Sequence, residues 1–512
     1  MTAVLAKLRS NLANWRDWEI NPIVIKELRQ AVRNRAVAGM LMLMLVVLFI
    51  FSLGFLISNS FDIDSDNQIG GPMFQTFVTI LAGMSIFFIP LYMGVRIAAE
   101  RQENNPDLMY VTTLSPARII RGKFFCGAYM ALLFFSACMP FMAFTNLLRG
   151  VDLPTVFFIL FFLYLIVCAA NLLAIFFACL PLSRPFKILL ALYGFFQSIW
   201  IIVPAVFAST HMMRAGIGSM MGERYFWIET VTSITIAGAL GGLFYVLSVA
   251  LISPPSANRA LPVRRYITLI WLLGGLLALA WVWKAADPEA ILVWHHIMFI
   301  LLTLSLVVVV SNGDRLSFRV RRDIPAAGWK RTVAFLFFNG AAGGLAWVTV
   351  LYAITYLMSA FVMTIASPRA ATTFSIEDRS HFMIVFPAVL AYLFAYALTA
   401  LFIHRQFLPN RPAKVAGLLA ILLAGLAAVG PGIVLFFLNQ LSWNSLEGMQ
   451  LGNVFNVFYL HNDGRAFYHL CFAGAWLLVA AILNARWFWR QANDFKPLAI
   501  RAVPPETAPA GQ

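Results

Sequence analysis

The sequence predicts an all-α fold, that of a polytopic integral membrane protein with about twelve transmembrane helices. The first indication is composition, because 61% of the 512 residues are hydrophobic and only 12% are charged, too few to cover a soluble protein of this length. The second is that the hydrophobic residues gather in runs of about 18–25, the length at which a helix crosses a bilayer core of about 30 Å. The third is that Lys and Arg concentrate in alternate connections between these runs.

Twelve hydrophobic runs define the expected spans. They cover residues 37–58, 73–95, 124–147, 155–182, 188–209, 225–252, 266–284, 291–311, 333–362, 384–403, 415–439 and 467–489. The series divides into two six-span halves, 37–252 and 253–489. The segment 1–36 precedes them, and a tail rich in Pro and Ala, 490–512, is expected to be disordered.

The basic residues predict the orientation of the spans. With the N-terminus on the inner side, 30 of the 37 Lys and Arg residues fall in inner segments and 7 in outer ones. The positive-inside rule therefore predicts a protein of the cytoplasmic (inner) membrane with both termini in the cytoplasm. The net charge of +15 follows from this topology, so it indicates attraction to anionic membrane lipid and does not indicate nucleic-acid binding.

The segment before the first span predicts an amphipathic helix at the membrane surface. Its sequence, NPIVIKELRQAVRNR, opens with Asn21 as the N-cap and Pro22 at the first helical position. Apolar side chains fall on one face of this helix and polar ones on the other, with Glu27 near the polar edge. The apolar set is Val24, Ile25, Leu28, Ala31 and Val32, and the polar set is Lys26, Arg29, Gln30, Arg33 and Asn34. Such a basic amphipathic helix suits a membrane surface.

The connection after the second span is too polar to enter a bilayer and contains two predicted helix starts. It reads ERQENNPDLMYVTTLSPARIIRGK over residues 100–123. Asn105 and Ser115, each followed by Pro, are predicted N-caps, the first of a short helix and the second of the helix that enters the third span. The loop is expected to present its acidic side chains to the cytoplasm.

These two segments together resemble the permease subunits of type-2 ABC exporters. Such permeases begin with an elbow of the form NP…KELRQ…R and carry, after the second span, a loop of the form E…G-T-L-(D/E)-L-L…T-P-L-S…I…GK. The present loop keeps the Glu, the Asp-Leu, the Thr, the Leu-Ser-Pro and the Gly-Lys, whereas Asn105-Pro106 replaces Gly-Thr and TT replaces TP. The resemblance covers roughly residues 20–125, and the corresponding loop of the second half, 312–331, has no second Leu-Ser-Pro.

The resemblance implies that the chain is the membrane subunit of an exporter and is not itself an enzyme. A coupling helix in the loop is then expected to dock on a cytoplasmic ABC ATPase, which would hold the ATP and Mg²⁺, so no cofactor is expected on this chain. The implied ATPase contacts are Glu100, Glu103, Asn105, Asp107, Leu108, Met109 and Ser115, and the implied elbow residues are Asn21, Pro22, Lys26, Glu27 and Arg29. Membrane lipid and a second permease, identical or different, are the other expected partners. The substrate is unidentified and expected to be hydrophobic.

The spans lack the features that other energy sources need. No span has Asp, Glu, Lys or Arg in its central part, whereas ion-driven carriers usually need intramembrane charged groups. The sequence also has no GxxxxGK(S/T) phosphate loop, so ATP chemistry is expected on another chain.

No metal site is predicted either. The five cysteines show no CxxC spacing and all fall within spans, where burial is expected. His295 and His296 are adjacent, so on a helix they point about 100° apart and are expected to be interfacial residues that share no ion. The pairs Gly238–Gly242 and Gly340–Gly344 predict close packing of helices within the bundle.

Two other classes of function stay open at this point. A secondary carrier also commonly has twelve spans, but it predicts a titratable site inside the bundle. A membrane enzyme or scaffold without transport activity predicts His, Asp or Glu clustered at one membrane level, and the region around His295 is the only such candidate.

Overall fold

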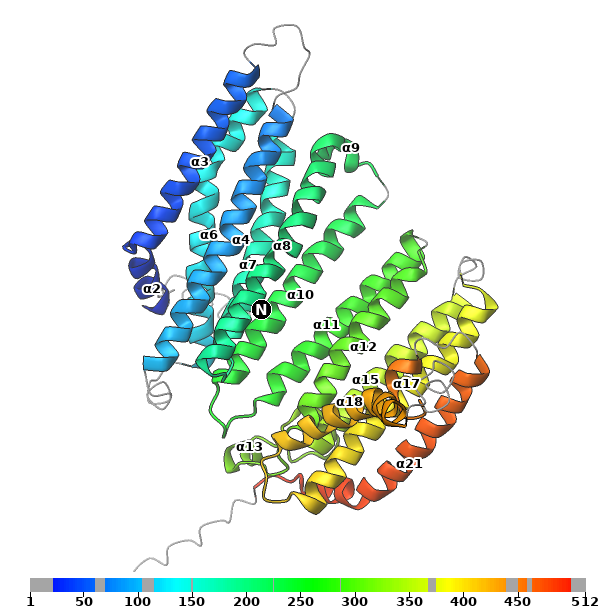
Figure 1. Ribbon diagram of the computed structural model, residues 1–512. Coiled ribbons are helices and arrows are strands. Elements are labelled where there is room, and N and C mark those ends of the chain that lie inside the picture. The colour runs from blue at the N-terminus through cyan, green and yellow to red at the C-terminus, as the bar shows by residue number, and fades with distance from the viewer. Residues whose placement is uncertain are drawn as a thin grey trace, which may run out of the picture. The chain divides into compact units, whose positions relative to one another are not determined.

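The computed structural model describes residues 22–59, 70–103, 115–148, 151–223, 225–285, 287–366, 374–438, 450–457 and 463–498. Within these ranges the chain is helical and contains no strand. It forms two compact units, Met1–Pro254 and Pro255–Gln512, each of which is described by itself (Figure 1).

The first unit is built around three long helices that pack on one another. Its elements are α2 (Pro22–Val32), α3 (Arg35–Asn59), α4 (Gly70–Glu103), α6 (Pro116–Leu147), α7 (Leu153–Cys179), α8 (Arg184–Ala215), α9 (Ile217–Met220) and α10 (Phe226–Ile252). The three central helices are α4, α6 and α7, each of which packs against the other two. Helix α7 also packs against α8 and α10, and α2 lies against α6 (Figure 1). The core of the unit contains fully buried aromatic side chains such as Phe77 and Phe134.

A local capping motif fixes the start of α7. Asp152 is its N-cap and accepts a hydrogen bond from the Thr155 backbone N–H at 3.2 Å, and Pro154 occupies the first turn. The Thr155 hydroxyl in turn accepts from the backbone N–H of Ile217 at 2.9 Å. The short helix α9 is therefore tied to the beginning of α7, so α7 and α10 both begin at this end of the unit.

The second unit also packs its longest helices against each other. Its elements are α11 (Ala260–Ala280), η1 (Trp281–Ala285), α12 (Glu289–Val310), α13 (Phe318–Arg322), α14 (Gly328–Phe337), α15 (Ala341–Phe361), η2 (Val362–Ala366), α17 (Ile376–Phe407), α18 (Lys414–Phe437), α20 (Val454–Val457) and α21 (Asp463–Asp494). The α17–α21 pair encloses the buried Tyr392 and Tyr396, whose rings pack on the partly buried Trp476.

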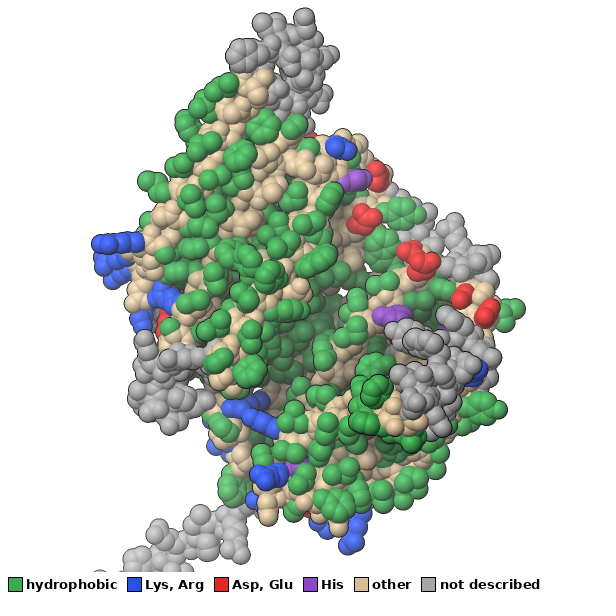
Figure 2. Space-filling view, viewed as in Figure 1, with side chains coloured by type: hydrophobic (Ala, Val, Ile, Leu, Met, Phe, Trp, Pro, Cys, Tyr) green, Lys and Arg blue, Asp and Glu red, His purple; other side chains and the backbone are tan. Residues whose placement is uncertain are grey.

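Among the described residues, twelve helices are long and apolar enough to cross a membrane, which confirms the all-α fold with about twelve spans. They coincide in order and approximate position with the twelve predicted runs. Figure 2 shows mostly hydrophobic side chains along the helices on the visible face, with charged side chains near the helix ends. The chain is therefore a multi-pass membrane protein.

The ninth span begins later than the hydrophobic pattern predicts. The apolar run from residue 333 is interrupted, because α14 ends at Phe337 and α15 begins only at Ala341. Between them Gly340 has φ of +131°, a conformation that residues with a Cβ rarely adopt. The chain turns here, so the first part of the predicted span belongs to a separate helix.

The predicted close helix contact is present at Gly344, where a Cβ would lie 2.6 Å from Cγ1 of Val309 on α12, but not at Gly238. A Cβ at Gly238 would meet no atom within 4 Å, whereas one at Gly241 would lie 3.2 Å from Cδ1 of Leu172. In the second unit, a Cβ at Gly343 would lie 1.9 Å from the carbonyl oxygen of Phe335, so α14 and α15 can approach only through this glycine.

Two smaller expectations also differ from the structure. Helix α21 continues to Asp494, past the predicted start of the disordered tail, and Phe495 is buried against Phe335 and Phe338. Of the five cysteines, three are buried as expected, whereas Cys168 is half-buried and Cys471 is exposed.

Candidate functional site

Four charged side chains meet where α2, α4 and α6 come together. Glu27 on α2 forms ion pairs with Arg96 Nε at 3.1 Å and with Lys123 Nζ at 3.3 Å. Lys123 also reaches the Glu100 carboxylate at 2.5 Å, and Arg96 Nε lies 3.8 Å from Glu100. Two acids and two bases therefore form a neutral set, which we call the elbow cluster.

The elbow cluster is buried on one side and open on the other. Glu27 and Lys123 are 3% and 6% exposed, whereas the Glu100 side chain is 39% exposed. A buried charge without a partner is strongly unfavourable, so Glu27 and Lys123 depend on each other and on Arg96. The interactions of the more exposed Glu100 with Lys123 and Arg96 are weakened by solvent screening.

The sequence of α2 places Glu27 on its packed face. Val24, Glu27 and Ala31 are all buried, and their spacing of three and four residues aligns them along one side of the helix. Ile25 and Val32 are exposed, although the helical wheel groups them with the apolar face. The predicted position of Glu27 near the polar edge therefore differs from the structure, in which two cations from other helices neutralise it.

The last turns of α4 contribute a matching polar stripe. Tyr92, Arg96 and Glu100 are four residues apart and so lie on one side of the helix. Arg96 donates hydrogen bonds to the Tyr92 hydroxyl at 3.0 Å and to the side-chain carbonyl of Gln30 on α2. The guanidinium thus holds α2 against α4 through both charge and hydrogen bonding.

The elbow cluster also joins the two helix ends that flank residues 104–114. Helix α4 ends at Glu103, and α6 begins at Pro116 with Ser115 as its N-cap. Because Glu100 belongs to α4 and Lys123 to α6, their ion pair connects both ends of this connection. Glu27 then ties the same two helices to α2.

The structure brings only part of the predicted site together. Glu27 and Glu100 meet in the elbow cluster, Lys26 and Arg29 are exposed on α2, and Ser115 is exposed at the start of α6. Pro22 begins α2 and Glu103 ends α4. The remaining predicted residues, Asn21, Asn105, Asp107, Leu108 and Met109, lie outside the described residues. Contact of any of these residues with an ATPase stays a prediction.

Sequence reasoning did not identify Arg96 and Lys123 as partners of Glu27. The available signal was the placement of Glu27 between Val24 and Ala31, because an acid in the middle of a packed stripe requires a cation from a neighbouring helix. The identity of that cation could not be read from the sequence, since Lys123 lies 96 residues away along the chain.

A second buried polar centre lies in the second unit, around Arg264. Its guanidinium donates to the carbonyl oxygens of Leu336 at 2.8 Å, Phe338 at 2.6 Å and Gly340 at 3.0 Å. These carbonyls are exposed by the break between α14 and α15, and an arginine has enough donors to bind all three. The arrangement stabilises the break and leaves Arg264 no described carboxylate partner.

The two adjacent histidines have different environments. His295 is buried, with Nδ1 3.0 Å from the Ser359 hydroxyl and its ring edge-on to Phe386 at 4.4 Å between centroids. His296 is exposed and its Nδ1 lies 2.7 Å from the Leu292 carbonyl. Among the residues that the structure describes, no three His, Cys, Asp or Glu side chains gather as a metal site would require.

Comparison with protein-family models, curated proteins and solved structures finds no match for this chain. The interpretation of its function therefore rests on its own residues.

Proposed function

We propose that the chain is the membrane-spanning permease subunit of an ABC-type exporter, driven by ATP that a separate cytoplasmic ATPase hydrolyses. The observation that carries the proposal is the elbow cluster. It joins the amphipathic helix α2 to both ends of the connection 104–114, the segment whose sequence resembles a coupling helix.

The proposed mechanism follows from the connectivity of α4 and α6. Each is a long helix, of 34 and 32 residues, that continues from the 104–114 connection into the membrane. An ATPase that binds this connection would displace both helix ends, and the elbow cluster would make α2 move with them. Binding that favours one arrangement of the bundle over another shifts the population between inward and outward states.

The location of buried charge supports an energy source outside the bilayer centre. Among the described residues the buried Asp, Glu, Lys and Arg side chains are Glu27, Lys123 and Arg264. Glu27 is on the short α2, and the other two lie near the first residues of α6 and α11. An ion-driven carrier is expected to hold such groups deeper in its spans. In the proposed orientation α2 and the 104–114 connection lie on the cytoplasmic side of an inner membrane, together with both termini.

The first experiment tests association with an ATPase. The full chain is purified from its native membranes in mild detergent, and any copurifying nucleotide-binding protein is identified and assayed for ATP hydrolysis. Leu108→Asp is expected to abolish association, because an interface that buries this side chain would bury an unpaired carboxylate. Leu147→Asp is the matched control, since Leu147 is 78% exposed at the opposite end of α6.

Two results would contradict the proposal. One is that no ATPase lacking membrane spans accompanies the chain, and the other is that Leu108→Asp binds it as well as Leu147→Asp does. A second measurement uses proteoliposomes that contain both proteins: an uncoupler is expected to leave transport intact, while removal of ATP stops it. The reverse pattern would favour a secondary carrier.

A further inference from the structure

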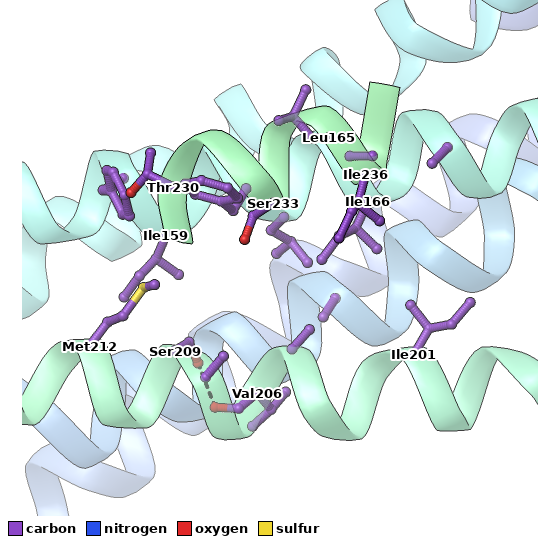
Figure 3. Close-up of a pocket in the computed structure, with 18 of the residues that line it drawn as sticks. Ile159, Leu165, Ile166, Ile201, Val206, Ser209, Met212, Thr230, Ser233 and Ile236 are labelled. Carbon is purple, nitrogen blue, oxygen red and sulfur yellow. Dashed lines mark hydrogen bonds between the residues drawn. The ribbon is translucent and has the colours of Figure 1, made fainter. Parts of the chain in front are cut away.

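The first unit contains a cavity of about 550 Å³ that the elbow cluster does not touch. It lies between α8 and α10, with α7 and part of α4 behind it (Figure 3). Both α8 and α10 pack on α7, and the cavity occupies the space between them. Its volume falls in the range of about 300–1,000 Å³ that is typical of small-molecule sites in proteins.

Most of the cavity wall is apolar. Ile159 and Ile166 come from α7, Ile201 and Val206 from α8, and Ile236 from α10 (Figure 3). Such a wall binds an aliphatic or aromatic body through dispersion and the hydrophobic effect. It offers few hydrogen-bond partners along its length, so a strongly polar solute would lose its hydration without compensation.

Polar side chains gather at one end of the cavity, on the first turns of α10. Glu229 and Ser233 are four residues apart and Thr230 lies between them, so the three follow one side of the helix. In Figure 3 the Ser233 hydroxyl points into the space between α10 and α8. Across the cavity, the Ser209 hydroxyl already donates to the Val206 carbonyl at 2.7 Å. The polar groups of the site that can still bind a ligand therefore lie on α10.

Glu229 gives this end of the cavity a negative charge. Within the described part of the chain no Lys, Arg or His forms an ion pair with it. Glu229 is exposed at this end of the cavity, so solvent screens part of its charge, but its carboxylate still attracts a cation that approaches closely. The same charge repels an anion of equal shape, so the site discriminates by charge as well as by size.

We propose that this cavity binds an amphiphilic cation, with its positive group beside Glu229 and its apolar body between α8 and α10. The inference that this cation is the substrate of a permease rests on the proposed function. The inference that the cavity binds the cation does not. Because α7 and α10 both begin at this end of the unit, the charged group of the ligand lies at the end opposite the elbow cluster.

The test compares two ions of the same shape and opposite charge, tetraphenylphosphonium and tetraphenylborate. Equilibrium binding of each is measured on the full chain in nanodiscs without any ATPase, and binding to empty nanodiscs is subtracted. The parent chain is expected to bind the phosphonium saturably. Glu229→Gln is expected to weaken that binding about tenfold, which corresponds to about 1.4 kcal/mol, while binding of the borate is unchanged or improved.

Two pairs of variants separate the charge effect from the shape effect. Glu223→Gln removes an exposed carboxylate next to α9 that does not line the cavity, so it is expected to bind like the parent. Ala237→Phe places a ring inside the cavity and is expected to abolish binding. Val231→Phe adds the same ring at an exposed position of α10 outside the cavity and is expected to have no effect.

The inference is overturned if the phosphonium binds Ala237→Phe as tightly as Val231→Phe, or if Glu229→Gln and Glu223→Gln bind it equally. It is also overturned if the only saturable ligand is the borate or a neutral lipid. These results leave the ATPase association untouched, so a failure here is distinguishable from a failure of the proposed function. Conversely, loss of the ATPase partner would leave a positive binding result standing.

Discussion

Removal of the Glu27 carboxylate is the sharpest test of the elbow cluster. In Glu27→Ala the Arg96 guanidinium loses its partner at 3.1 Å, and the Lys123 ammonium loses one at 3.3 Å. Both cations then depend on Glu100, and they repel each other more strongly because the acid between them is gone. Breaking a buried ion pair in this way typically costs about 3–5 kcal/mol of folding free energy.

Glu100→Ala provides the comparison within the same cluster. The Glu100 side chain is 39% exposed, so water screens its interactions with Lys123 and Arg96. An ion pair of this kind is worth about 1 kcal/mol or less. The expected difference between the two variants is therefore at least about 2 kcal/mol, although both remove one carboxylate and leave the same two cations.

The measurement is the free energy of unfolding of the purified chain in mixed micelles, followed by circular dichroism as SDS is added. Lys123→Met and the double variant Glu27→Ala with Lys123→Met complete a cycle. Because these two side chains contact each other, the double variant is expected to lose less stability than the sum of the single losses, by about 0.5–3 kcal/mol. Strict additivity, or a Glu100→Ala loss as large as that of Glu27→Ala, would refute the reasoning.

Three further predictions test other parts of the structure. Gly343→Ala is expected to destabilise the chain by about 1–3 kcal/mol, because its Cβ would meet a backbone oxygen at 1.9 Å, whereas Gly238→Ala, with nothing within 4 Å, is expected to be neutral or slightly stabilising in the same SDS titration. Arg264→Met is expected to cost at least about 3 kcal/mol because three carbonyls lose a charged donor, and a loss below about 1 kcal/mol would contradict that role. In a cysteine-free chain, Ser65→Cys is expected to react with a membrane-impermeant thiol reagent on intact cells and Thr113→Cys is not; the opposite labelling would invert the proposed topology.

The positions of the spans could be predicted from the sequence because hydropathy is a property of each segment alone. A run of apolar residues long enough to cross the bilayer has to satisfy its backbone internally, and a helix does this without a partner. The twelve helices therefore appear where the twelve runs lie. The ends of helices also depend on local signals, as the Asp152 cap of α7 illustrates.

The break before α15 could not be predicted in this way. The run from residue 333 is apolar enough on average, despite Asn339 at the break, that hydropathy alone accepts a continuous helix. The interruption is stabilised by Arg264, which binds carbonyls 72 to 76 residues further along the chain. Only the packed structure brings these groups together. Hydropathy therefore predicted the existence of the span correctly but its first residue incorrectly.

The candidate site likewise has features that the sequence predicts and features that only the tertiary structure shows. The sequence by itself determined that α2 is amphipathic, that it precedes the first span and that a polar connection follows the second. It did not determine that Glu27 faces inward, because a buried carboxylate is stable only where cations are packed against it. Those cations are Arg96 on α4 and Lys123 on α6. The cavity beside Glu229 is likewise a property of several helices together, since apolar residues that line a cavity and those that face lipid are alike in composition. The sequence by itself determined the properties of single segments, namely their hydropathy and amphipathicity. The ion pairs and the cavity were decided by the tertiary structure, because each requires side chains from distant segments to lie close together.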